Sequence, residues 1–378
     1  MLYRPPALDD ADRRALDDIA EMRHELRHLL RTPRRWSKQL RRNLTARAIA
    51  GSNTIEGYAA TVDDVEDLMA GEEPLETSDA TRRELDGYQR AMTYILALSD
   101  ADAEFRYDLG LINGLHYMVQ EHHAQKRPGR LRRSSVYVSS PEDELVPIYT
   151  APASEQVPQL MDELIAWLNE GDLDLPVHVR ASMAHLNLVK IHPWADGNGR
   201  MSRALSTLVF SREELMPAEF SSIEEWLGHG QNTYGYYEVL RQTGGPEWSP
   251  RADTSAWIKF CLTGHHVQAQ QAKRRLDLYT RAWQALTEEA QKAGLDERVA
   301  VALLPAFLGS RVRRPVYQSD AELSLQQSTR DIRELVRTDW LEQHGEARGR
   351  FYTAGPRTRA VQESVRRSTE PFVYPYRR

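Results

Sequence analysis

The chain carries the sequence HPWADGNGRMSR at residues 192–203, and this stretch decides how the rest is read. His192 can accept a proton near neutral pH, as a general base must. The carboxylate of Asp196 suits Mg²⁺, which proteins usually bind together with substrate phosphates. A base and a hard-metal ligand four residues apart predict chemistry at a phosphate.

The same stretch also offers an anion-binding loop and two guanidinium groups. Small residues let consecutive backbone N–H groups converge on an anion. Arg200 and Arg203 follow, about one helical turn apart, so both can face a polyphosphate. The residues of the predicted anion-binding loop are Gly197, Asn198 and Gly199.

The flanking sequence predicts that this stretch joins two buried helices. Apolar residues recur at helical spacing over about residues 176–190, and the period restarts after Gly199. His192 precedes a proline, which disfavours the α conformation and should end the first helix. The second helix should begin at the glycines, with the positive end of its dipole toward a bound phosphate.

The stretch resembles the signature of the Fic family (filamentation induced by cAMP), H-P-F-x-[D/E]-G-N-G-R-x-x-R. One position departs from it, because Trp194 stands where the family has phenylalanine. That residue anchors the core in the family, so we expect a change in packing and not in chemistry. The resemblance covers roughly residues 35–265.

The resemblance implies a role for each residue of the signature. His192 would take the proton from a protein hydroxyl as the hydroxyl attacks the α-phosphate of ATP. Asp196 would hold Mg²⁺ (or Mn²⁺) between the α- and β-phosphates, and residues 197–199 would form the anion hole. Arg200 would contact the β-phosphate and Arg203 the γ-phosphate. Pyrophosphate would leave and AMP would stay on the protein, in a reaction that depends on positioning and charge stabilisation.

A second motif, SNTIEG at residues 52–57, lies far upstream. Ser52 and Glu56 are four residues apart, so they share one face of a helix, and Gly57 suits its end. The motif resembles the family's inhibitory pattern, [S/T]-x-x-x-E-[G/N], within an inhibitory helix over about residues 36–57. The resemblance implies that Glu56 pairs with Arg203, blocks the γ-phosphate position, and can also support removal of AMP.

Residues 136–138 and 146–149 read as two short strands around a polar turn, residues 139–144. This hairpin resembles the family's flap, where a strand edge pairs with the target's backbone and presents its hydroxyl to the histidine. Arg130, Arg132 and Arg133 precede it, and we expect them to form a solvated flap base. The residues predicted to dock the target are Ser135, Val136 and Tyr137.

Two tyrosines follow the signature in the segment YYEVL, residues 236–240, which resembles the family's YYxxL segment. The resemblance implies that Tyr237 lines the adenosine pocket. His185, in the helix before the signature, matches a common family position, and we expect it to be buried for packing or hydrogen bonding.

The composition fits a cytoplasmic protein that works away from membranes. The chain has 378 residues with 49 Lys+Arg against 55 Asp+Glu, a net charge of −6, so no global field draws it to nucleic acid or anionic lipid. Its single cysteine, Cys261, excludes an intramolecular disulfide, and we expect it in the core. No apolar run is long enough to span a bilayer. The composition leaves homo-oligomerisation open.

We expect a mainly α fold: a Fic-type helical bundle with a short β-hairpin flap, then a small winged helix-turn-helix domain. Residues 296–350 hold nine Lys/Arg and nine Asp/Glu, which disfavours DNA as the partner of this domain and favours a protein contact. Its helices are expected around Val299–Phe307, at Ser319–Leu323 and from Ser324, and its wing at residues 342–350. The predicted parts are residues 1–104 (helical), 105–265 (catalytic core), 266–294 (connecting helix), 295–356 (winged helix) and 357–378 (a disordered tail).

Two functions follow from these patterns. The first is an enzyme that transfers AMP from ATP to a protein hydroxyl, with the chain itself among the candidate targets. The alternative is a nucleotide-sensing regulator that binds DNA or a protein partner through its winged helix. Intact residues at all chemical positions of the signature favour the enzyme.

Overall fold

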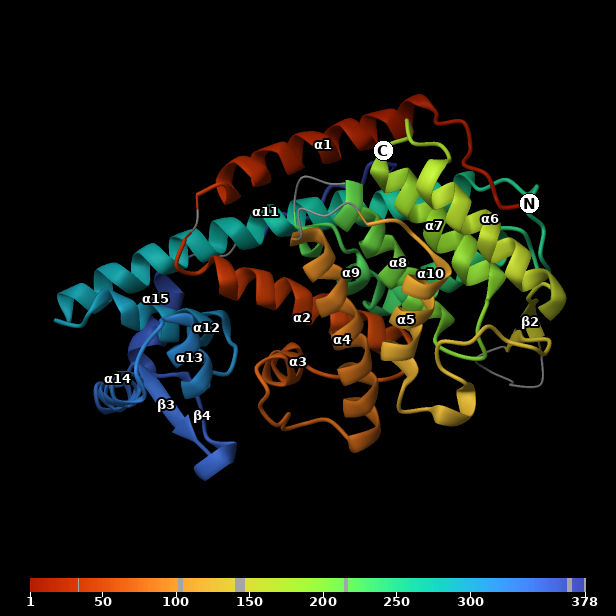
Figure 1. Cartoon of the computed structure of the whole chain (residues 1–378). Coiled ribbons are helices and arrows are strands. Elements are labelled where there is room, and N and C mark those ends of the chain that lie inside the picture. Colours follow the sequence, from red (N-terminus) through yellow and green to blue (C-terminus); the bar gives the residue numbers. More distant parts are fainter. Residues whose placement is uncertain (33, 101–104, 140–146, 214–216, 366–368, 377–378) are drawn as a thin grey trace.

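The computed structural model describes residues 1–378 except 33, 101–104, 140–146, 214–216, 366–368 and 377–378, which are traced in grey in Figure 1. The predicted class, mainly α with a short β-hairpin, is confirmed. Short 3₁₀ turns join some of the helices, at Ala124–Lys126, Ser154–Gln156, Ala218–Phe220, Glu297–Val299 and Ala347–Gly349.

The N-terminal part is helical. Asp9 and Asp12 form a capping box at the start of the first helix, and the Thr61 hydroxyl caps the third by accepting from the Asp64 N–H (3.1 Å). The period of the first helix predicts a buried Leu29, but this residue is exposed because it lies in the last turn. The helices are α1 (Asp10–Leu30), α2 (Ser37–Ile55), α3 (Val62–Met69) and α4 (Asp79–Asp100).

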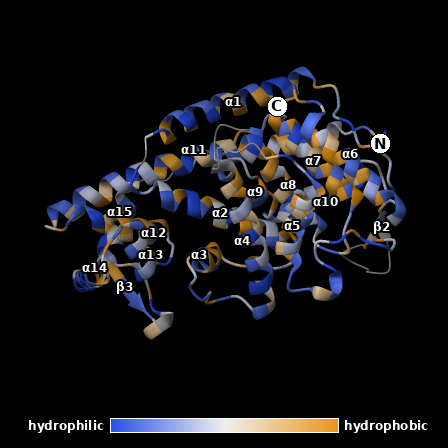
Figure 2. Ribbon diagram, viewed as in Figure 1, coloured by the Kyte–Doolittle hydropathy of each residue, from blue (hydrophilic) through white to orange (hydrophobic). Residues whose placement is uncertain are grey.

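The central part is built around a hairpin of two buried helices, α7 (Val177–Ile191) and α8 (Asn198–Glu213). Nearly every residue of α7 is buried, as expected of a helix surrounded by other helices. Hydrophobic residues gather where α6, α7 and α8 meet, whereas the outer side of α1 is mostly hydrophilic (Figure 2). The neighbouring helices are α5 (Leu109–Gln120), α6 (Val157–Glu170), α9 (Glu224–Leu227) and α10 (Gly230–Gln242).

The predicted hairpin is present as β1 (Tyr137–Ser139) paired antiparallel with β2 (Pro147–Thr150). Its predicted turn falls mostly on residues 140–146, which lie outside the described residues. The Thr150 N–H of β2 donates to the Pro246 carbonyl (2.8 Å), so part of that edge is covered. Among the described residues, β1 pairs with no strand other than β2.

One helix, α11 (Ser255–Lys292), runs along α1 and through most of the length of the molecule (Figure 1). A connecting helix was predicted over residues 266–294, after a core ending near residue 265; the helix is present, but it begins earlier, at Ser255. Residues 263–267 stay helical because they pack on the core, where Gly264 lies against the Trp226 ring. The predicted burial of Cys261 is confirmed.

The C-terminal part has the element order predicted for a winged helix, three helices and then a hairpin. The second helix was predicted at Ser319–Leu323 but lies at Arg314–Asp320, because Pro315 suits a helix start. Ser324 and Gln327 form a capping box for the third. The elements are α12 (Ala300–Leu308), α13 (Arg314–Asp320), α14 (Leu325–Arg337), β3 (Leu341–His344) and β4 (Phe351–Ala354).

The prediction of a disordered tail is wrong for the part that the structure describes. Pro356–Ser364 form a helix, α15, whose Gln362 amide donates to the Phe307 carbonyl (2.6 Å). Further on, the Val373 carbonyl accepts from Gln270 (2.8 Å) and the Tyr376 hydroxyl donates to Asp12 (2.8 Å). The tail is ordered there because its apolar and aromatic residues have α11, α12 and α1 to pack against. Arg366, Arg367, Arg377 and Arg378 lie outside the described residues.

Across the part of the chain that the structure describes, none of the helices combines the length and the apolar character needed to cross a bilayer.

Candidate active site

The loop between α7 and α8 holds the signature residues. Helix α7 ends at Ile191, one residue beyond the predicted end, and His192 adopts a left-handed conformation with φ 52°. Such a conformation is uncommon outside glycine and turns the chain sharply. Helix α8 begins at Asn198, as predicted. The local sequence therefore positions the loop residues at the meeting point of two buried helices.

His192 is oriented for use as a base. Its Nδ1 lies 3.1 Å from the Val189 carbonyl oxygen, which fixes Nδ1 as the protonated nitrogen and leaves Nε2 as an acceptor. Burial, together with the nearby Arg132 guanidinium, lowers the pKa of His192 to about 4, although the Val189 carbonyl acts in the opposite direction. The imidazole is therefore neutral near pH 7 and can take a proton.

Arg132 holds the loop to the hairpin, a role that the sequence did not reveal. We expected a solvated flap base; Arg130 and Arg133 are exposed, but Arg132 is buried. Its guanidinium donates to the carbonyls of His192 (2.8 Å), Ser134 (2.9 Å) and Pro152 (2.6 Å). These three bonds fix the foot of the hairpin to the backbone of His192, the predicted general base.

The residues after the loop form the start of α8. Gly197 has φ +76°, and a side chain there would collide with Gln120. The Asn198 side chain accepts from the Trp194 N–H and donates to the Trp194 carbonyl, both at 3.0 Å, so it clamps the loop backbone. The backbone N–H groups at the N-terminus of α8 have no intrahelical partners and suit an anion.

Trp194, the departure from the family signature, is fully buried. Its ring stacks on His116 (centroids 4.3 Å apart), and its Nε1 donates to Asn113 (3.0 Å). His116 also contacts the carbonyl oxygen of Asp196 through Nε2 (3.0 Å). The larger tryptophan ring thus packs against the loop, and its polar nitrogen has a hydrogen-bond partner.

Asp196 is the residue that fits a metal ion. Its Oδ1 accepts from the Gly197 N–H (2.7 Å), while Oδ2 lies 3.8 Å from the Lys126 ammonium. The carboxylate is about half exposed (45%), so it has oxygen lone pairs available to a hard cation such as Mg²⁺.

Arg203 is buried in α8 and faces the end of α2. Its guanidinium donates to the Ser52 hydroxyl (2.7 Å), the Ser52 carbonyl (3.1 Å) and Glu56 Oε1 (2.6 Å). Burial lowers the pKa of this arginine, but Glu56 and the nearby Tyr236, Tyr88 and Glu224 together raise it more, so the net shift is upward. Glu56 caps α2, and Gly57 follows in the left-handed region at φ +85°. The structure thus brings the two motifs together.

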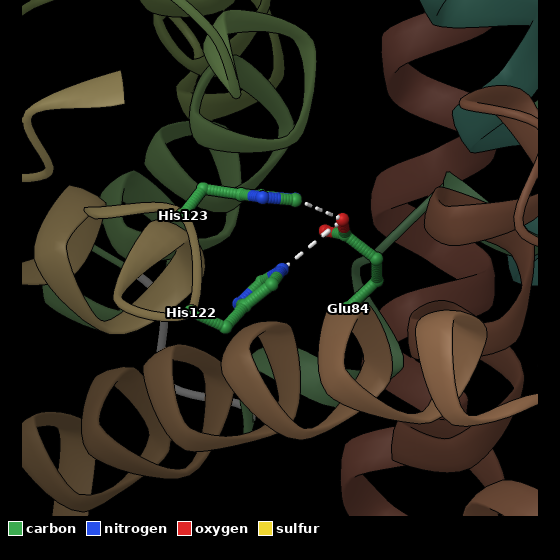
Figure 3. Close-up of side chains that lie close together, drawn as sticks. All are labelled: Glu84, His122 and His123. Carbon is green, nitrogen blue, oxygen red and sulfur yellow. Dashed lines mark hydrogen bonds and ion pairs between the residues drawn. The ribbon is translucent and has the colours of Figure 1, made fainter. Parts of the chain in front are cut away.

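Arg200 is equally buried but faces α4. Its guanidinium forms an ion pair with Glu84, a residue that no sequence pattern singled out. When the Gln120 amide oxygen is turned toward Arg200 and Gly197, it accepts from the Arg200 guanidinium (2.8 Å) and from the Gly197 N–H (3.3 Å). Glu84 also lies beside His122 and His123 (Figure 3).

Two arginine nitrogen atoms of this site carry N–H groups that are available to a ligand. Among the described residues, Arg203 Nη1 and Arg200 Nε are buried and make no hydrogen bond. Arg203 Nη1 and the Glu56 carboxylate both lie beside Gly199, so the carboxylate occupies the space at the helix N-terminus. Buried donors without partners cost free energy, and a polyphosphate would satisfy them.

Comparison with known proteins agrees with this geometry. Residues 107–210 match the model of the Fic/DOC family. This part of the chain is therefore similar to a Fic domain. It is 30% identical over 197 residues to protein adenylyltransferase Fic of Aedes aegypti, covering 52% of this chain and 34% of the relative. The Nematostella vectensis protein of the same name is 27% identical over 282 residues, covering 72% and 57%. The chain therefore spans only about a third to three fifths of the length of these curated relatives.

Solved structures share the fold. A Fic family protein from Desulfovibrio desulfuricans G20 superposes with a TM-score of 0.58 at 22% identity, covering 94% of this chain and 99% of that one. Fic-1 from C. elegans superposes with a TM-score of 0.56 at 21% identity, covering 70% and 73%.

The remaining predicted residues of the Fic domain lie around this centre. The Tyr237 hydroxyl donates to the Ile55 carbonyl (3.0 Å), so this tyrosine contacts the end of α2. Tyr236 is buried and its hydroxyl contacts His185 Nε2 (2.9 Å), in agreement with the expected burial of His185. Burial raises the pKa of Tyr237 to about 12, so its hydroxyl stays protonated.

The predicted docking residues lie at the hairpin that Arg132 anchors. The Val136 carbonyl accepts from the Ala151 N–H (3.1 Å), and Ser135 and Tyr137 are exposed. The Tyr149 hydroxyl of β2 donates to the Lys190 carbonyl of α7 (2.6 Å), which is a second link from the hairpin to the catalytic helices. The hairpin is therefore fixed to the site at its base.

Proposed function

We propose that this chain transfers AMP from ATP to a hydroxyl side chain of a protein, and that Glu56 holds the reaction in check. The observation that carries the proposal is the ion pair between Glu56 and Arg203 (2.6 Å) beside a neutral His192. The names of the curated relatives, protein adenylyltransferase, support the same reaction.

In the proposed reaction, His192 Nε2 takes the proton of the target hydroxyl. The freed oxygen attacks the α-phosphorus of ATP, and the bond from that phosphorus to the bridging oxygen breaks. AMP remains on the target as a phosphodiester, and pyrophosphate leaves with the electron pair. The orientation of Nε2, set by the contact of Nδ1 with Val189, favours this role.

The charge of the triphosphate would be met by groups that are already in place. Arg200, Arg203 and the backbone N–H groups at the start of α8 supply the donors, and they need little reorganisation because they are buried and held. Asp196 would hold Mg²⁺, which neutralises phosphate charge when bound.

Glu56 would act as the inhibitor because its carboxylate occupies the position that the γ-phosphate needs. While the ion pair lasts, ATP can bind only with its chain of phosphates displaced. The same carboxylate lies near the phosphodiester that the reaction makes, so we propose that it also supports removal of AMP by orienting a water molecule. In this proposal the target docks its backbone at Ser135, Val136 and Tyr137, and the chain itself is among the candidate targets.

The direct test compares AMP incorporation from α-labelled ATP by the wild-type chain and by Glu56→Gly. We expect a rise of at least ~10-fold, because removing Glu56 frees the buried Arg203 guanidinium for the phosphate. Arg203→Ala should show no rise, since it removes the inhibitory contact and the phosphate contact together. Glu238→Ala, which breaks the exposed pair with Arg241, is the matched control and should equal wild type. Equal rates for Glu56→Gly and wild type would refute the inhibitory role.

The removal reaction is tested on protein that has already been modified by Glu56→Gly. Wild-type chain added with Mg²⁺ should release AMP, whereas Glu56→Gly should release at least ~10-fold less, since the water would lose its orienting group. Release by both proteins at the same rate would show that Glu56 has no part in removal.

A further inference from the structure

A cluster of three metal-binding side chains lies beside the active site, outside the signature. Glu84 comes from α4, and His122 and His123 follow the end of α5 (Figure 3). One potential ligand atom from each of the three side chains lies within 4.8 Å of the other two. His122 Nε2 is 3.0 Å and His123 Nε2 is 2.7 Å from the same atom, Glu84 Oε1.

The cluster is poorly explained by packing alone. Both ring nitrogens of His122 are buried. Nε2 lies 3.0 Å from Glu84 Oε1 without a well-directed hydrogen bond to it, and Nδ1 has no hydrogen-bond partner among the described residues. Buried polar atoms in native proteins usually make well-formed hydrogen bonds, so the contact of Nε2 with Glu84 leaves room for a better partner. The two imidazole rings also lie close together, with centroids 4.2 Å apart, and converge on a single oxygen.

We propose that Glu84, His122 and His123 bind a divalent transition metal ion, with Zn²⁺ as the best match. Two imidazoles and one carboxylate are a ligand set that Zn²⁺ accepts, and a water molecule would complete four coordination. Mg²⁺ and Ca²⁺ are excluded by chemistry, because they prefer ligand sets made of oxygen. This site is separate from the predicted magnesium ligand, Asp196.

Access and charge both suit the ion. An open hollow of about 370 Å³, lined by His122 together with residues of α4 and by Glu121, leads to the cluster from solvent. The Glu84 carboxylate supplies the one acidic ligand of the cluster, and its other oxygen is already held by the Arg200 guanidinium.

The site would be linked to the phosphate-binding arginine through Glu84. One carboxylate oxygen, Oε2, contacts Arg200, while the other, Oε1, faces the two histidines. Arg200 would thus orient a metal ligand from outside the coordination sphere, as second partners of metal ligands commonly do. The proposal stands without the proposed function, because it concerns binding of an ion only.

The test uses the full chain, freed of metal by a chelator and then titrated with Zn²⁺ by calorimetry. We expect one tight ion per chain, and His123→Ala should weaken it by at least ~10-fold, the loss seen when even an outer partner of a metal ligand is removed. The matched control is His24→Ala. His24 and His28 are exposed on α1 four residues apart, a spacing that can also chelate Zn²⁺, so this variant should keep the tight ion.

A second measurement does not depend on any variant folding. X-ray absorption of the wild-type chain loaded with one Zn²⁺ should show two imidazole ligands and oxygen. The assignment is overturned if Zn²⁺ binds equally to wild type and His123→Ala, if His24→Ala removes the tight ion, or if the spectrum shows oxygen ligands alone.

Discussion

Two arginines three residues apart on α8 are both buried, and each is paired with a glutamate from elsewhere in the chain. The pairs differ in where the glutamate sits. Glu56 ends a helix and its side chain is 28% exposed, whereas Glu84 lies within α4 and is 3% exposed. A carboxylate at a helix end can move away at small cost, but one inside a packed helix cannot. The comparison identifies the Arg203 pair as the movable one.

The surroundings of the two glutamates point the same way. Glu84 is also held by His122 and His123, so it has partners on both oxygens. Glu56 contacts Arg203 through Oε1, next to the N-terminus of α8. We therefore expect Glu56 to act as a switch and Glu84 as a fixed support for Arg200.

The largest expected effect comes from removing the proposed general base, His192. In a Glu56→Gly background, His192→Ala should lower AMP transfer by at least ~10²-fold, the usual contribution of general base catalysis. Labelled ATP should still bind, because both arginines remain, and this is checked by equilibrium dialysis. Transfer at the rate of Glu56→Gly alone would show that His192 is not the base. The ion pair of Glu56 with Arg203 would then have no His192-dependent reaction to regulate.

The pH dependence of AMP transfer is a second test of His192 as the base. Because burial lowers the pKa of His192 to about 4, its neutral, base-competent form persists from pH 8 down to about pH 5. The kcat/KM of Glu56→Gly for its protein target, at saturating ATP and Mg²⁺, should stay flat over that range. It should then fall about tenfold per unit below pH 4, as protonation removes the base. A fall centred near pH 6.5, the ordinary value for histidine, would contradict the buried position of His192.

The sequence predicted one of the two pairs because both partners lie in recognisable motifs. Ser52 and Glu56 share a helix face, and Arg203 closes the signature; that Glu56 pairs with Arg203 was implied by the resemblance to the Fic family. Glu84 and Arg132 carry no such pattern, since each is a single charged residue whose partner is set by how distant helices pack. Helix ends marked by proline or glycine were also predictable, as at His192 and Gly57.

Two of the errors in the fold prediction share one cause. The tail after residue 356 and the continuous helix α11 are ordered by contacts with distant parts of the chain, including Val373 with Gln270 and Tyr376 with Asp12. Local composition carries no record of such contacts, so a polar, arginine-rich end reads as disordered. Tertiary packing overrides local preference here.

A matched pair of substitutions separates the switch from the support. Glu56→Gln and Glu84→Gln each remove one charge and keep the shape of the side chain. Glu56→Gln should raise transfer several-fold with little change in stability, because its side chain is partly exposed. Glu84→Gln should not raise transfer, and it should lower the free energy of unfolding by about 1.5–3 kcal/mol, the scale of a buried hydrogen bond to a charged group. Guanidinium unfolding and labelled-ATP assays measure both, and a rise in transfer with Glu84→Gln would make the two pairs equivalent.

The smallest effect is expected at the far end of the inhibitory helix. The first half of α2 packs in a core that it shares with α11 and the C-terminal helices. There, Arg42 donates to both oxygens of Asp320 (3.0 and 2.8 Å), and Gln39 donates to the Val301 carbonyl (2.7 Å). Because one rigid helix joins these contacts to Glu56, loosening them should let Glu56 leave Arg203 more often.

Asp320→Asn tests that coupling by weakening one ion pair. Asparagine keeps the shape of Asp320 and one hydrogen bond to Arg42, so the loss should be about 1 kcal/mol, which limits the rise in AMP transfer to about fivefold, below that of Glu56→Gly. Glu334→Gln breaks the exposed pair with Arg337 in the same C-terminal part, away from α2, and should leave transfer unchanged. If Asp320→Asn also leaves it unchanged while melting shows that the C-terminal part has loosened, the switch is confined to the last turn of α2. The C-terminal helices would then hold α2 in place without controlling the release of Glu56 from Arg203.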